Sequence, residues 1–128
     1  MKYTEIKSFE DACKATGNDP KALPDFSMIP EKHRKALLSH FMLLIIVMAI
    51  NEGWEPDWND DDQRKWTPWL EVEASEDHKG GSGLSLYVVD RWDTDATVGS
   101  RLCYESREKA EYAFETFKDL YEDYFLIK

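Results

Sequence analysis

The sequence has little that would support secretion, redox chemistry or metal binding. Its two cysteines, Cys13 and Cys103, lie far apart and form no metal-type pair, so we expect two reduced thiols in a cytoplasmic protein. The opening stretch, MKYTEIKSFED, contains no apolar run of the kind found in a secretory signal. The histidines have no metal-ligand spacing, because His33 and His40 would lie about 10 Å apart along a helix.

The sequence also lacks an apolar run that is best interpreted as a membrane span. Its longest candidate, ALLSHFMLLIIVMAI at residues 36–50, is shorter than the roughly 20 apolar residues that a span needs. Ser39 and His40 interrupt this stretch, and charged residues close it off on both sides. A buried helix is therefore expected in a protein that does not enter the membrane.

No catalytic motif can be recognised. Neither cysteine lies within a known nucleophile signature, and GGSG at residues 80–83 lacks the Lys and Ser or Thr that follow in a phosphate-binding loop. Carboxylates are so numerous that no pair stands out as a general acid and base. We therefore expect no enzymatic activity, and the sequence implies no cofactor.

The sequence is rich in acidic residues. Asp and Glu number 26 against 16 Lys and Arg, which gives a formal net charge of −10. Such a charge opposes direct binding to nucleic acid, whose phosphates attract basic residues, and it favours solubility and a basic partner. An alternative is an acidic decoy that imitates phosphate charge and occupies a DNA-binding protein, although basic residues interleave with the acids here.

The first half of the chain has helical periodicity. Ser8, with an acid three residues later, and Gly17 bound a short helix over Phe9–Thr16. Pro30 suits the first position of a long helix that Gly53 ends. The long helix is apolar almost all round, so it is central or shared with a second subunit. Its main apolar stripe is predicted to contain Leu37, Leu38, Phe41, Leu44, Ile45 and Met48.

The second half changes to a period of two. WTPWLEVEAS and LSLYVVDRW alternate as strands around the polar, glycine-rich loop at residues 75–83, and VGSRLCYE at residues 98–105 predicts a third strand, antiparallel to the second. REKAEYAFETFKDLYEDYF has one apolar face and predicts a last helix. The fold class is α+β in a single domain of residues 1–128: N-terminal helices, a small three-stranded antiparallel sheet, and a C-terminal amphipathic helix packed on the sheet.

The segment WEPDWNDDDQRKWTPW, residues 54–69, contains four of the five tryptophans. These rings could form a stacking platform for a sugar or nucleotide, which would make the chain a ligand-binding domain. Alternatively, the rings anchor the segment on the core, with Arg64 or Lys65 stacked on one of them. We expect anchoring first and recognition second. The candidate ligand-binding residues are Trp54, Trp58, Arg64, Trp66 and Trp69.

The same segment offers a candidate cation site. Asp57, Asn59 and Asp61 occupy alternate positions, as the first ligands of a calcium loop do. The pattern is incomplete, because Asp62 replaces the glycine and Pro68 the bidentate glutamate of such a loop. The alternative is that the first two of these residues cap a local turn.

Four stretches together resemble a family of small uncharacterised proteins from gut-type bacteria and their phages or other mobile elements. They are PEKHRKAL, NEGWEPDWND, PWLEVEAS and VGSRLCYESREKAEYAFETFKDLYEDY, and the resemblance covers most of the chain from Pro30 onward. The family has no established activity, so no catalytic residue can be carried over. The resemblance implies a cytoplasmic, accessory, phage-related role. We therefore expect a non-enzymatic interaction module that binds an unknown protein partner or itself.

Overall fold

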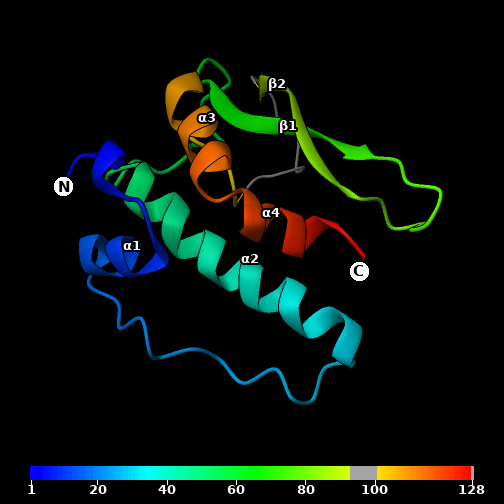
Figure 1. Cartoon of the computed structure of the whole chain (residues 1–128). Helices are drawn as coiled ribbons and strands as arrows, with labels where there is room; N and C mark the ends of the chain where they lie inside the picture. The colour runs from blue at the N-terminus through cyan, green and yellow to red at the C-terminus, as the bar shows by residue number, and fades with distance from the viewer. Residues whose placement is uncertain (93–100, 128) are drawn as a thin grey trace.

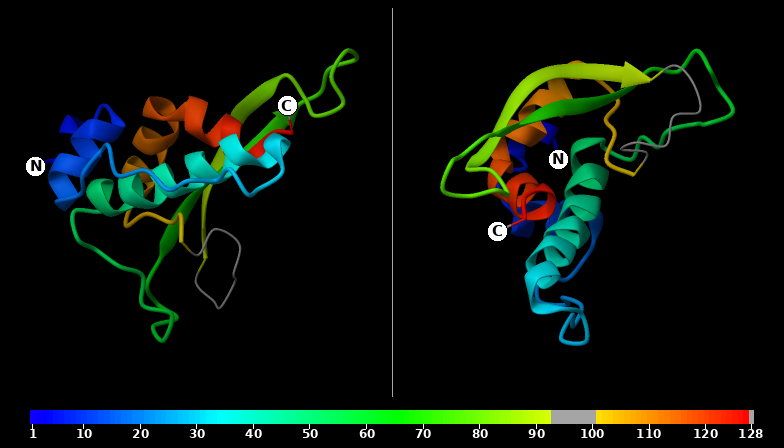
Figure 2. Two further views of the ribbon diagram at one scale, coloured as in Figure 1. Left: turned by 90° about the horizontal axis from the view of Figure 1, so that it is seen from below. Right: turned by 90° about the vertical axis from the view of Figure 1, so that its right-hand side faces the viewer.

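The structure is a computed structural model that describes residues 1–92 and 101–127, and it has an α+β architecture (Figure 1). Four α-helices accompany a two-stranded antiparallel sheet in this part of the chain. Helix α4 lies between the strands and the long helix α2 (Figure 1 and the right view of Figure 2). The elements are the 3₁₀ helix η1 (Tyr3–Glu5), α1 (Phe9–Thr16), α2 (Glu31–Ile50), β1 (Lys65–Glu73), β2 (Gly83–Trp92), α3 (Arg107–Thr116) and α4 (Lys118–Phe125).

The short helix α1 has the bounds that its sequence predicts. The Ser8 hydroxyl accepts a hydrogen bond from the Asp11 amide at 3.1 Å, and the Asp11 carboxylate accepts one from the Lys7 amide at 3.0 Å. Gly17 ends the helix with φ of 75°, a left-handed conformation that costs glycine little. Because both end signals are local, they act whatever the rest of the chain does.

The ends of α2 differ from the prediction. Pro30 precedes the helix as its N-cap residue, with φ −49° and ψ 134°, and Glu31 is the first helical residue. At the other end the helix stops at Ile50, before the predicted Gly53. Asn51 caps it, and the chain then reverses through Glu52, a non-glycine residue with φ of 54°, and Gly53, with φ of 90°.

The buried face of α2 overlaps the predicted stripe only in part, because Ile45 is buried and Phe41 and Leu44 pack against the core. Leu43, Ile46 and Ile50 are fully buried, whereas Met48, which was predicted to be in the stripe, is 55% exposed. Because the helix is apolar on most sides, its own periodicity cannot choose the inner face. The choice is made by α1 and α4, which both pack against α2.

By length and mean hydropathy alone, α2 would also pass for a membrane-spanning helix, the one such helix among the described residues. The central helix of a soluble protein meets the same two criteria, and 39% of the most apolar window of α2 is buried inside the protein.

The sheet is a hairpin of β1 and β2, paired from Lys65 opposite Trp92 to Glu73 opposite Gly83. The predicted third strand is not confirmed: residues 98–100 lie outside the described residues, and in 101–105 only Tyr104 forms a bridge. That bridge is to Trp66 of β1, rather than to the predicted neighbour β2. On either side of Tyr104 the backbone bonds elsewhere, because buried Asn51 donates to the Cys103 carbonyl and accepts from the Glu105 amide, both at 3.0 Å.

The predicted C-terminal helix is two helices. Ser106 caps α3 by accepting a hydrogen bond from the Lys109 amide at 3.2 Å, and Phe117, with φ of −116°, separates α3 from α4. Helix α3 packs on both strands, while α4 packs mainly on α2. Packing on the sheet therefore holds chiefly for the first half of the predicted helix.

The N-terminal segment is fixed against α3. The Tyr112 hydroxyl donates to the carbonyls of Thr4 at 3.1 Å and Ile6 at 2.7 Å. The Tyr112 ring meets the ring of Tyr3 edge-on, with centroids 5.4 Å apart. The first and last thirds of the chain thus share one wall of the core, to which Ile6 contributes a fully buried side chain.

Candidate functional site

The tryptophans of residues 54–69 lie in four different environments. Trp54 lines a cavity beside the last turn of α2. The Trp58 ring lies under the Lys65 ammonium, 4.9 Å from its centroid, and the Trp66 ring packs on the core with the Arg107 guanidinium 5.1 Å away. Trp69 is 48% exposed and lines an apolar groove. Trp54 and Trp69 line different hollows, and recognition of a sugar or nucleotide at these residues stays a prediction.

The acidic part of this segment is a loop that projects from the helices (Figure 2). The Asp57 carboxylate accepts a hydrogen bond from the Asn59 amide at 2.9 Å, and the Asp60 carboxylate accepts one from the Asp62 amide at 3.0 Å. Such turns fold the backbone locally by satisfying amides with side-chain oxygens. The turn-capping interpretation is confirmed for Asp57, and Asn59 contributes its backbone amide.

A buried lysine holds this loop in place. Lys65 is 1% exposed, and its ammonium group donates to the carbonyls of Asp60 and Gln63, each at 3.1 Å. The Trp58 ring covers the same ammonium group, so the predicted stacking of a cation on a ring is confirmed for Lys65. Arg64, the other candidate, is exposed.

The three candidate calcium ligands, Asp57, Asn59 and Asp61, are all exposed. Within residues 1–92 and 101–127, no group of three or more His, Cys, Asp or Glu side chains could hold a metal ion. Calcium binding at these residues therefore stays a prediction from sequence spacing. The described carboxylates do not converge there into a set of oxygen ligands.

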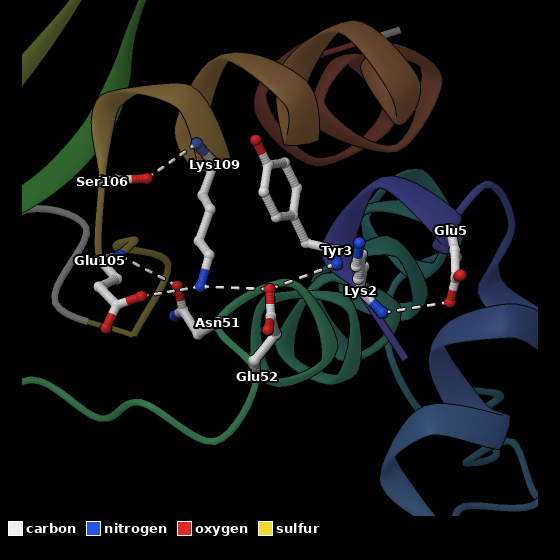
Figure 3. A network of polar contacts seen from close by, with 8 residues as sticks. All are labelled: Lys2, Tyr3, Glu5, Asn51, Glu52, Glu105, Ser106 and Lys109. Carbon is white, nitrogen blue, oxygen red and sulfur yellow. Dashed lines mark hydrogen bonds and ion pairs between the residues drawn. The ribbon is translucent and has the colours of Figure 1, made fainter.

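A polar network that the sequence did not reveal lies at the end of α2 (Figure 3). The ammonium group of buried Lys109 lies 2.8 Å from the Glu105 carboxylate and 3.6 Å from that of Glu52. The same Glu52 oxygen accepts a hydrogen bond from the Tyr3 amide at 3.3 Å, and the Tyr3 ring lies 5.7 Å from the ammonium. The spacing of Glu105 and Lys109, four residues apart, was the one available signal.

Two hollows lie among the described residues. An apolar groove of about 390 Å³ runs between β1 and α4, with Leu84, Leu102 and Tyr121 on its floor and Trp69, Val72 and Phe125 on its rim. A second cavity, of about 500 Å³, lies at the ends of α1 and α2, and its walls include Met1, Thr16, Met48, Glu52, Trp54 and Glu55.

Neither cysteine faces a hollow as a nucleophile would, since both thiols are buried. Burial raises the pKa of Cys103 from 9.0 to about 11, although Lys65 acts in the opposite direction.

We expect both thiols to resist Ellman's reagent at pH 8 in the folded protein and to react fully in guanidinium chloride. The pKa of Cys103 is higher in the folded chain than in the unfolded chain. The neutral, buried thiol therefore makes its full contribution to the free energy of unfolding below pH 9, and this contribution is lost as the pH rises toward 11. Rapid labelling of native Cys103 at pH 8 would contradict the predicted protection of its thiol from Ellman's reagent.

Comparison with known protein families, curated proteins and solved structures finds no match to this chain.

Proposed function

We propose that the chain is a non-enzymatic interaction module, of phage or mobile-element origin and cytoplasmic, which binds a protein partner in the groove between β1 and α4. The observation that supports this proposal is the rim of the groove. Trp69, Val72 and Phe125 are 48%, 53% and 50% exposed around an apolar floor. A contiguous apolar patch with aromatic anchors is typical of a protein-binding surface.

Charge around the groove favours a partner segment that carries basic residues. None of the described residues that line the groove is Lys, Arg or His, and the whole chain carries a formal net charge of −10. Since opposite charges at a rim steer association and select partners, an apolar segment flanked by Lys or Arg fits this surface best.

Site-specific photocrosslinking tests the proposal. A benzoylphenylalanine placed at position 72, within the groove rim, is expected to form an adduct with one partner when the protein is irradiated in the cells that produce it. The matched control is the same group at position 28, because Met28 is 95% exposed but belongs to the connection before α2.

The adduct at position 72 should decrease several-fold when Trp69→Ala removes the neighbouring anchor. Its mass separates a second copy of this chain from a different protein. Equal labelling from positions 72 and 28, or no adduct from position 72, would reject the groove as the docking surface.

A further inference from the structure

The cavity at the ends of α1 and α2 combines an anionic rim with apolar walls. None of the described residues that line it has a Lys, Arg or His side chain, and the two carboxylates of Glu52 and Glu55 outnumber the one α-ammonium group of Met1. We propose that this cavity binds a small organic cation of the alkylammonium class. The proposal concerns a different surface from the groove and does not depend on it.

Electrostatics select a cation over an anion or a neutral molecule. Helix α1 ends at Thr16 and α2 at Ile50, and both Thr16 and the last turn of α2 adjoin the cavity. The C-terminal end of a helix carries a partial negative charge, so two helix ends and two carboxylates act in the same direction. The Lys109 ammonium beyond Glu52 is shared with Glu105, which leaves that trio one net negative charge.

The walls select an alkylated cation over a bare metal ion. Trp54 is half-buried and lines the cavity together with Met1 and Met48, which are both more than half exposed. An indole face attracts cations, most strongly where water is excluded, and thioethers make adaptable apolar contacts with methyl groups. A metal ion would need several converging oxygens instead.

The carboxylate of Glu52 is held before any ligand arrives. Its Oε1 atom is fixed by the Tyr3 amide at 3.3 Å and by the Lys109 ammonium at 3.6 Å (Figure 3). A group that is already ordered loses little conformational freedom on binding. Trp54 and Glu55, two and three residues further along the chain, complete the lining on this side.

The experiment is a nuclear magnetic resonance titration that follows the indole N–H signals of the ¹⁵N-labelled protein. The probe is choline, and the matched control is 3,3-dimethylbutan-1-ol, which has the same shape without the charge. A Trp54→Phe sample identifies the Trp54 signal. Choline is expected to shift that signal saturably, and the neutral alcohol is expected to leave it unmoved.

Glu55→Gln should weaken choline binding by about fivefold, the effect of one charge on a partly exposed cation. Glu31→Gln, at the opposite end of α2, should leave the affinity unchanged. Equal shifts with choline and the alcohol, an unchanged affinity in Glu55→Gln, or no shift of the Trp54 signal at 100 mM choline would each overturn the proposal.

Discussion

Leu43→Ala is expected to lower the free energy of unfolding by about 3 kcal/mol, because it removes a fully buried side chain from the centre of α2 and leaves a cavity. Leu43 belongs to the main core cluster, where α1 and α4 pack against the helix. Their side chains can close over the vacated space only in part. Urea unfolding followed by tryptophan fluorescence measures the change.

The matched control for Leu43→Ala is Met48→Ala on the same helix. Met48 is 55% exposed, so its truncation should change the free energy of unfolding by less than about 1 kcal/mol. Both substitutions place alanine in a helix, and helix propensity therefore contributes little to the difference between them. A larger loss from Met48→Ala than from Leu43→Ala would mean that α2 faces the core with the other side, and equal losses would contradict the difference in burial between the two residues.

Asn51→Ala is expected to cost about 2–4 kcal/mol. The Asn51 side chain is 2% exposed, and it satisfies the Cys103 carbonyl and the Glu105 amide together. Each backbone group left unpaired away from water costs about 1–3 kcal/mol. Because these two groups fix the strand-like stretch beside β1, thermal unfolding of the variant should begin at a markedly lower temperature.

An exposed asparagine in the same part of the chain supplies the control for Asn51→Ala. Asn59→Ala removes an amide side chain from the projecting loop and should change stability by less than about 0.5 kcal/mol. Asn51→Asp keeps the acceptor for the Glu105 amide but removes the donor to the Cys103 carbonyl. It should therefore also destabilise, and wild-type stability in both Asn51 variants would show that these bonds contribute nothing.

The sequence predicted elements well where their signals are local. The bounds of α1 follow from Ser8 and Gly17, and the start of α3 follows from Ser106, because a cap acts within one turn of the chain. The two strands follow from alternation, which a half-buried sheet requires. The inner face of α2 could not be predicted in this way, because apolar residues surround the helix and only its neighbours distinguish one side from another.

The candidate sites depended on contacts between distant residues, which no local pattern encodes. Asn51 and Cys103 are far apart in the sequence, and their bond helps to explain why, of residues 101–105, only Tyr104 pairs with β1. The partners of Lys65 are local, but its burial under Trp58 is a tertiary property. Composition correctly drew attention to residues 54–69, yet it could not reveal that these tryptophans belong to different surfaces.

The bonds from Tyr112 to the carbonyls of Thr4 and Ile6 also govern when the domain can be completed during synthesis. They join residues 108 and 106 positions apart, so the opening segment leaves the ribosome long before its partner exists. At about 5–20 residues per second, the delay is on the order of 5–20 seconds. Throughout that interval Ile6 lacks the tyrosine that later closes over its backbone, and a nascent chain halted before residue 112 should expose its first residues to a protease.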